Sequence, residues 1–298
     1  MKRILILLAI LGLTPAAPAS IAAQDFSAHW HDGHAELSGY RLTVSRYGED
    51  RAGTAVMIFV TEPFSESKKV KVNDHTKNPE DTFDVLKLNL IRDFQTGIYD
   101  YNTMVSVFSR TSNFEPVKIS FTSAEWCGHV YTELLFDKSR IQVENNSYFE
   151  DESGTRLVPR PENLVSEDNL FILLRGLRGE FLKPGESKKA DYLPGVFFSR
   201  LTHQATSVVK ATISRRTDNE RVTVPAGDFD TMVYDVSAGG RDGVFHIETA
   251  YPHRIVRWEL TPDVRGELTG TKRLQYWSLN KEGGEEYLKE LGLPAPVK

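Results

Sequence analysis

The side chains best suited to chemistry in this sequence lie together in the stretch Glu125-Trp126-Cys127-Gly128-His129. Successive side chains of a β-strand alternate between two faces, so Glu125, Cys127 and His129 would share one face if the stretch is a strand. A carboxylate, a thiolate and an imidazole can bind zinc, and a thiolate beside an imidazole can act as nucleophile and base. The spacing therefore indicates one candidate site, for a hydrolase or for a metal-dependent enzyme.

The competing interpretation of Cys127 is structural. It is the single cysteine of the chain, which excludes an intramolecular disulfide framework. Cysteine is among the most buried residue types, and most lone cysteines act as small core hydrophobes. A thiol and an imidazole two positions apart on a strand also need not come within hydrogen-bond reach. We therefore expect Cys127 to be a buried core residue and the protein to be non-enzymatic.

A second group of candidate ligands consists of His29, His31 and His34. Imidazole suits zinc, copper and nickel, but histidines near a chain terminus are more often solvated. The chain contains no Gly-x-Ser-x-Gly or His-Glu-x-x-His motif and no glycine-rich loop that would cradle a phosphate. We expect neither a metal site nor a cofactor.

The N-terminus has the composition of an export signal. Lys2 and Arg3 precede an apolar run over residues 4–13, and small residues surround Ala22 and Ala23. The apolar run is shorter than the ~20 residues that a membrane-spanning helix needs, and no later run is long enough. The sequence thus predicts a signal peptide over residues 1–23. A single β-rich domain over 24–298 would follow it, located in the periplasm and peripheral to the envelope at most.

The rest of the chain is dominated by strand patterns. A net charge of −5 argues against a nucleic-acid partner, which would favour a basic face. Apolar residues alternate with polar ones from Glu36 to Tyr47, from Leu86 to Val107, and through the stretch Val222–Trp258. Turn residues lie between these runs at the spacing of a meander. Roughly a dozen strands are predicted, including one over Val196–Leu201, whereas Asp151–Pro161 is predicted to be a loop.

Two short helices interrupt the strands. Ser166 precedes two acidic residues and an apolar run from Leu170 to Leu177, which is typical of a helix that begins at a serine cap. The C-terminal stretch around Glu285, Glu286 and Lys289 predicts a second short helix. The fold class expected is therefore mainly β, with a large antiparallel sheet that curls because it is so wide, and with the central helix plugging its concave side.

A curled sheet would form a hollow, and aromatic side chains are the expected lining of a ligand cavity. Aromatic residues are also enriched in ordinary sheet cores, which is the alternative. Arg254 lies at a corner of the chain where it could bind a lipid headgroup or a carboxylate. The predicted cavity residues are Tyr99, Tyr101, Tyr131, Phe198, Phe245, Tyr251, Arg254 and Trp258.

One stretch carries a family resemblance. The sequence VTVPAGDFDTMVYDV, followed by the corner YPHRIVRWE, resembles a family of exported bacterial proteins whose half-open β-barrel is similar to that of the lipoprotein carrier LolA. The resemblance covers roughly Glu36 to Asn280. LKLNLIRDFQTGIYDYNTM and EWCGHVYTEL resemble proteins often labelled septum-formation inhibitors. The nucleotide pyrophosphatases of that name start with Ser-x-Ser-Pro-Arg-Arg on an α/β fold, and this chain has no such motif.

The LolA-like resemblance implies a barrel-like cavity suited to acyl chains, and it transfers no catalytic residue. The function expected is that of an exported binding protein that holds a lipid, an acyl chain or a lipoprotein. Two alternatives stay open. One is an enzyme built on Glu125, Cys127 and His129. The other is a scaffold for assembly of the cell envelope that recruits a partner by strand addition at a sheet edge. The sequence does not indicate an oligomeric state.

Overall fold

The computed structural model describes residues 21–262 and 264–294. The predicted signal segment lies outside these residues except for its last three positions, which begin helix α1 (Ile21–Trp30). None of the helices in the described part of the chain is long and apolar enough to cross a membrane.

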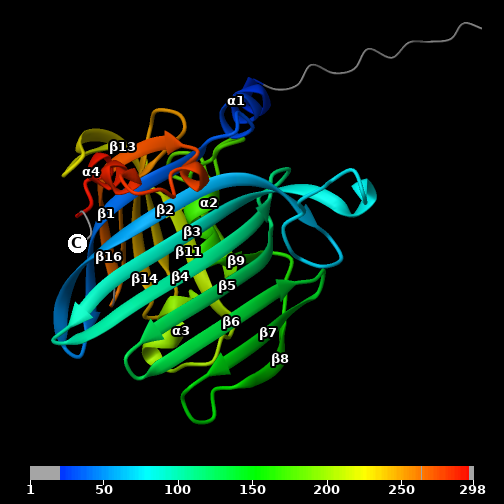
Figure 1. The fold of residues 1–298 in the computed structure, drawn as a ribbon, viewed down its shortest axis with the longest axis vertical. Coiled ribbons are helices and arrows are strands. Elements are labelled where there is room, and N and C mark those ends of the chain that lie inside the picture. The colour runs from blue at the N-terminus through cyan, green and yellow to red at the C-terminus, as the bar shows by residue number, and fades with distance from the viewer. Residues whose placement is uncertain (1–20, 263, 295–298) are drawn as a thin grey trace, which may run out of the picture.

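The first half of the chain forms a meander in which each strand pairs with the next in antiparallel fashion. These strands make the broad curved surface at the front of Figure 1. They are β1 (Ala35–Arg46), β2 (Glu49–Ser65), β3 (Thr82–Thr96), β4 (Tyr99–Arg110), β5 (Pro116–Glu125), β6 (Gly128–Phe136), β7 (Arg140–Ser147) and β8 (Gly154–Pro159).

The second half supplies the other strands and continues the same sheet through an antiparallel pair between β1 and β16. β9 runs parallel to β10, and β12 pairs only with β13. These strands are β9 (Leu164–Ser166), β10 (Ser187–Leu193), β11 (Val209–Arg215), β12 (Glu220–Val224), β13 (Gly227–Ser237), β14 (Asp242–Glu248), β15 (Ile255–Leu260) and β16 (Val264–Leu274).

The sixteen strands of the described residues form one sheet that curls but does not close. Its order is β8-β7-β6-β5-β4-β3-β2-β1-β16-β15-β14-β13-β11-β10-β9, so β8 and β9 are the two ends. These two strands are consecutive in the chain and are joined by residues 160–163 alone. The predicted fold class, a half-open antiparallel barrel, is confirmed.

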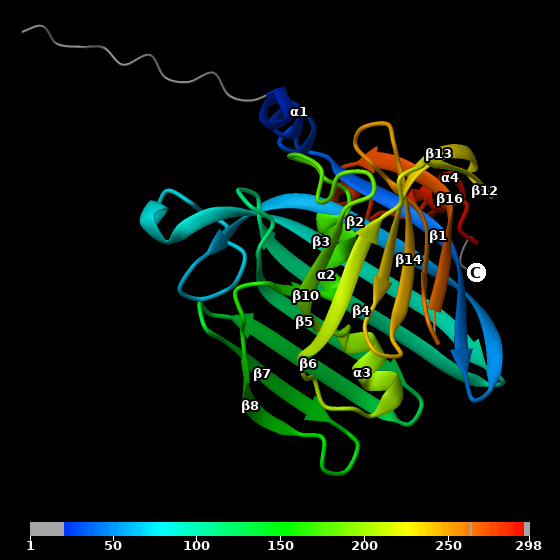
Figure 2. The ribbon, with the colours of Figure 1, turned by 180° about the vertical axis from the view of Figure 1, so that it is seen from behind.

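Short helices accompany the sheet. Seen from behind, in Figure 2, α2 and α3 lie against the concave side of the broad meander. The predicted central and C-terminal helices are both present as α2 and α4. The α-helices after α1 are α2 (Glu167–Leu173), α3 (Val196–Thr202) and α4 (Tyr287–Glu290), and 3-10 turns occur at Pro79–Asp81, Tyr276–Ser278 and Gly284–Glu286.

Two predicted segments are wrong. The residues predicted as a strand over Val196–Leu201 form α3, because burial of Val196, Phe197 and Arg200 follows a helical spacing of i, i+1 and i+4. The loop predicted over Asp151–Pro161 contains β8. Five of the six residues of β8 are exposed, so the strand has no apolar alternation that a sequence pattern would reveal.

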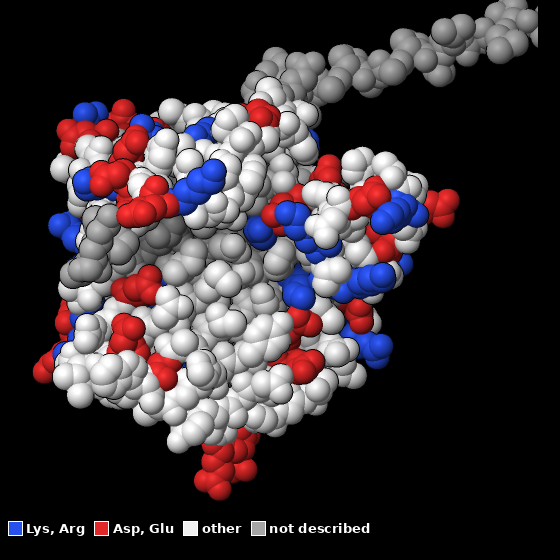
Figure 3. All heavy atoms as spheres, viewed as in Figure 1, with Lys and Arg blue, Asp and Glu red and all other residues white. Residues whose placement is uncertain are grey.

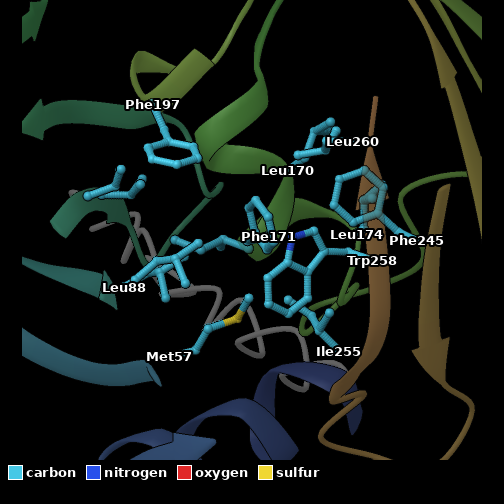
Figure 4. Packing of buried hydrophobic residues seen from close by; sticks show 14 of the residues in the cluster. Met57, Leu88, Leu170, Phe171, Leu174, Phe197, Phe245, Ile255, Trp258 and Leu260 are labelled. Atoms are coloured by element: carbon cyan, nitrogen blue, oxygen red, sulfur yellow. The ribbon is translucent and has the colours of Figure 1, made fainter. Parts of the chain in front are cut away.

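Helix α2 fills the middle of the hollow. The ring of Phe171 packs edge-on against Phe245 and Trp258, with centroid separations of 5.4 and 5.7 Å (Figure 4). Tyr40 of β1 contacts Trp258 from another side at 4.7 Å. Gly266 of β16 lies directly under the indole of Trp258, where there is no room for a Cβ atom. The helix is therefore part of a continuous apolar core.

A buried ion pair joins the end of α2 to the sheet. Arg175 is fully buried, and its Nη1 and Nη2 each lie 2.9 Å from an oxygen of Glu36 on β1, which is 2% exposed. The guanidinium also donates to the carbonyl oxygens of Pro252 and His253, at 2.9 and 3.1 Å. Removing one partner of such a pair leaves the other charged and buried.

We expect Arg175→Met to lower the free energy of unfolding by about 3–5 kcal/mol, because Glu36 would lose its counterion. Arg175→Met combined with Glu36→Leu should be more stable than Arg175→Met alone. Arg41→Met is the control, since Arg41 pairs with Glu267 at the surface and such a pair contributes about 0–1 kcal/mol. Urea denaturation measures all three. Equal losses in the two single variants would contradict the assignment.

Candidate ligand-binding site

The three residues predicted as a reactive group do not lie on one strand. β5 ends at Glu125 and β6 begins at Gly128, so Trp126 and Cys127 form a two-residue turn. Glu125 points into the protein and is buried, whereas Cys127 and His129 are exposed. The expectation that Cys127 is a core residue is therefore wrong, because the strand ends at Glu125, two residues before the position that would have pointed inward again.

Glu125 belongs to a different cluster, centred on Arg200 of α3. The two side chains are buried and form an ion pair, and Glu125 also accepts a hydrogen bond from Tyr99 Oη at 3.4 Å. The guanidinium of Arg200 lies over the ring of Phe149, 4.1 Å from its centroid. Its Nε atom is buried and has no hydrogen-bond partner. Arg200 thus connects α3 to the end of β5 by an ion pair, and its Nε–H group is the donor that has no acceptor.

The next residue of this cluster is His203, which ends α3 in a left-handed conformation at φ 55°. Its Nδ1 lies 2.6 Å from Oε1 of Glu152, in the segment between β7 and β8. Partial burial alone would raise the pKa of Glu152, but hydrogen bonds from Ser147 and His203 lower it below its usual range. α3 is therefore held at both its inner face and its C-terminus by charged contacts.

A pocket of about 120 Å³ lies between α3 and the inner face of β6 and β7. Val130 and Val196 supply apolar wall, and polar groups supply the rest. A second pocket of about 240 Å³ lies on the other side of the segment Ser199–Ala205. Ser199, Gln204 and Ala205 line both pockets, so this segment is the partition between them. Polar residues of the first pocket include Thr132, Asn145, Glu152, Arg156, Arg200 and His203.

The second pocket is bounded by Phe198 and Arg241. The guanidinium of Arg241 lies 4.4 Å from the ring centroid of Phe198 and pairs with both carboxylate oxygens of Glu167, at 2.6 and 2.9 Å. Glu167 is the first residue of α2, and it also accepts a hydrogen bond from Tyr192 Oη at 3.1 Å. Ser166 makes no side-chain cap at this helix, contrary to the sequence prediction, and its hydroxyl is buried without a partner.

Most of the aromatic residues predicted to line a cavity do not gather around one. Phe245 and Trp258 are fully buried against α2, and Tyr101 is buried against Phe94. Tyr131 and Tyr251 are exposed, and Arg254 pairs with Glu248. Only Phe198 lines a pocket given above. α2 occupies the space that these residues would otherwise surround.

Phe198 apart, no sequence pattern predicted the residues that line the two pockets. Arg200 lies within the segment that was predicted to be a strand, and His203 follows it, so strand alternation could not predict that the two side chains line the same pocket. Pro194-Gly195 before Val196 was the available sign of a helix start, because the chain cannot extend a strand regularly through a proline.

The side chains of the three N-terminal histidines each contact a different carboxylate. His29 lies 4.0 Å from Glu36, His31 lies 3.5 Å from Asp84, and His34 contacts Asp32. Among the described residues, no group of three or more His, Cys, Asp or Glu side chains is placed to hold a metal ion.

Comparisons with known proteins identify no family for this chain. No protein-family model matches the chain, and no curated protein matches it. One solved structure that matches is a Bacteroides fragilis NCTC 9343 protein of YmcC-like fold that is inferred to be exported. It is 10% identical, the match covers 80% of this chain and 95% of that chain, and the TM-score is 0.22. This similarity supports no functional inference, and no family is identified for the Val224-Pro225-Ala226-Gly227 motif.

Asp168 connects the two helices of the hollow. Its Oδ2 accepts a hydrogen bond at 3.1 Å from the backbone N–H of Val196, the first residue of α3. Burial, together with the neighbouring charge of Glu167, raises the pKa of Asp168 to about 6. The folded state therefore binds a proton at this carboxyl at pH values where the unfolded chain has released it.

The raised pKa of Asp168 determines how the free energy of unfolding changes with pH. Between about pH 4 and pH 6 the folded state binds more protons than the unfolded state, so stability should fall as pH rises, by about 2–3 kcal/mol in total. Asp168→Asn should remove this fall and keep an oxygen to accept from Val196. Urea denaturation at several pH values measures the slope. Asp218→Asn, at an exposed position, is the control, and a slope that survives in Asp168→Asn would refute the assignment.

Proposed function

We propose that this protein is a non-catalytic exported binding protein that holds an acyl chain, of a lipid or a lipoprotein, between α3 and the inner face of β6 and β7 in the periplasm. The observation that carries the proposal is that α3, a helix of two turns, is the partition between two pockets on the concave side of the sheet. Displacement of α3 would join them.

The surface beneath α3 suits an acyl chain. Many inward positions of β4 to β7 are apolar, although Thr103, Ser123 and Thr132 are inward polar positions, and the outward positions are mostly polar. Burial of apolar area is the driving force available to such a ligand. The apolar inward residues include Val105, Val107, Ile119, Phe121, Val130, Leu134, Ile141 and Val143.

The closed pocket is too small for a long chain. A volume of about 120 Å³ accommodates only a few methylene groups, so binding requires α3 to move. Its polar contacts to Glu125, Glu152 and Asp168 can be exchanged for water when it does. Arg200 and Arg156 line the pocket and provide charge for the polar end of the ligand.

The first test is to purify the protein from its own cell envelope, extract it with solvent and identify what is released. Native mass spectrometry should show a bound acyl-bearing lipid. Ser199→Phe, which fills both pockets from the partition, should then weaken binding of a fluorescent fatty acid to the delipidated protein at least about tenfold, a change of about 1.4 kcal/mol.

The matched control for this variant is Thr122→Phe, which adds the same bulk at an exposed position of β5. It should bind the fatty acid within about twofold of the wild type, because its side chain lies outside the barrel. A wild-type protein that releases no lipid and binds no fatty acid would refute the proposal. So would a Ser199→Phe protein that is folded and binds normally.

The free edge of β8 favours a second function, that of an envelope assembly scaffold. Within the described part of the chain, β8 has β7 as its one strand partner, and its other edge faces outward with Leu157 59% exposed. Strand addition would pair a partner with this edge. A photo-crosslinker at Leu157 should then capture one envelope protein in living cells, while the same crosslinker at Thr122 captures none. Equal capture at both positions would argue against the scaffold.

A further inference from the structure

Every second turn of the β1–β8 meander places a large exposed side chain at the same end of the sheet. In an antiparallel meander alternate turns lie on one side, and here these are the turns β1–β2, β3–β4, β5–β6 and β7–β8. Their tips carry Tyr47, Ile98, Trp126 and Tyr148, which are 63%, 77%, 65% and 67% exposed. Figure 1 shows these turns along the lower left margin of the broad sheet. We name these four side chains the tip row.

The turns at the opposite end carry fewer large exposed hydrophobic side chains. The β6–β7 turn, residues 137–139, is Asp-Lys-Ser, and the β4–β5 turn buries its one aromatic residue, Phe114. In the long β2–β3 connection only Val70 is a large exposed hydrophobic residue. Within the β1–β8 meander, every turn at the tip end thus carries a large exposed hydrophobic side chain, whereas at the opposite end only Val70 is such a residue.

Side-chain contacts connect three members of the tip row, and the connection from Tyr47 to Trp126 runs through the buried Tyr101. Tyr47 Oη lies 2.8 Å from Tyr101 Oη, and the ring of Tyr101 lies 5.3 Å from that of Tyr99. Tyr99 in turn lies 6.4 Å from Trp126. The ring of Tyr148 covers Gly128, in the same hairpin as Trp126, so closely that no Cβ would fit there. Four large exposed hydrophobic side chains at one end of a sheet mark a candidate interaction site.

The charges near the row exclude an anionic partner. Arg46 is turned onto the ring of Tyr47, 4.5 Å from its centroid, and Arg51 pairs with Glu49. The protruding charges are acidic, and Figure 3 shows red spheres at the lowest point of this otherwise mostly white margin. The exposed acids of these turns are Glu49, Asp50, Asp100, Glu150 and Asp151.

We propose that the tip row docks the protein on a zwitterionic lipid surface. Tyrosine and tryptophan prefer the interface of a bilayer, where the ring lies among apolar groups and the O–H or N–H stays hydrated. The side chains protrude from separate turns and form no groove, which suits a soft surface better than a folded partner. The acidic neighbours make a surface rich in anionic lipid unfavourable.

Docking would also orient the ligand pocket. Phe149 follows Tyr148 and packs against Arg200 and His203, both of which line the pocket beside α3. The pocket therefore opens next to the tip row. This orientation matters for transfer of an acyl chain only if the proposed function is right, whereas docking itself does not depend on it.

The test measures binding to vesicles of phosphatidylethanolamine and phosphatidylcholine by flotation. The variant Ile98→Ser/Trp126→Ser/Tyr148→Ser should lose at least about tenfold in affinity, since three exposed apolar groups no longer enter the interface. Val70→Ser, at the opposite end, should match the wild type. Replacing part of the lipid by phosphatidylglycerol should weaken binding of the wild type.

A spectroscopic readout separates docking from unfolding. Trp30 and Trp258 are buried, so Trp277→Phe leaves Trp126 as the one exposed tryptophan. Brominated lipids should quench its fluorescence. Absence of quenching, binding that strengthens with phosphatidylglycerol, or an equal loss in Val70→Ser would overturn the proposal. Ser199→Phe should dock like the wild type, which distinguishes failure of docking from failure of acyl-chain binding.

Discussion

The structure depends on buried arginine–carboxylate pairs that attach the interior helices to the sheet. A sheet of this width curls around more space than its own side chains fill, so segments from the middle of the chain must enter it. Three pairs make the attachments: Arg175 with Glu36, Arg241 with Glu167, and Arg200 with Glu125. Each partner is desolvated, so a substitution that removes one of them leaves the other charged and buried at a large cost. The pairs thereby fix where each segment lies.

The three attachments differ in what surrounds them, and this difference separates structure from function. Arg175 lies between the aromatic rings of Trp30 and Phe59, and α2 beside it is packed into the apolar core. Arg200 instead lies at the edge of a pocket, and α3 has polar contacts to Asp168 and Glu152 in addition to the apolar contacts of its buried Val196 and Phe197. α2 is thus packed into the core, while α3 borders a pocket and has polar partners as well as apolar ones.

The sequence predicted the strands correctly where buried residues recur with a period of two. The strands from Leu86 to Val107 alternate cleanly because one face packs and the other is solvated. The pattern failed at Val196–Leu201, where aromatic and β-branched residues favour a strand, but tertiary contacts select a helix. It failed at Cys127 because one two-residue turn reverses the face on which later residues lie. The pocket could not be predicted, since its residues come from segments that only the curl of the sheet brings together.

The two ends of the sheet, β8 and β9, are neighbours in the chain, separated by residues 160–163. From Pro159 to Leu164 the chain advances five residues, which at about 3.4 Å each spans at most roughly 17 Å. The seam of the barrel is therefore tethered. The connected ends of β8 and β9 cannot separate by more than this span, so the sheet cannot unroll into a flat one while its strands stay paired. The covalent chain itself limits how far the barrel can open along this seam.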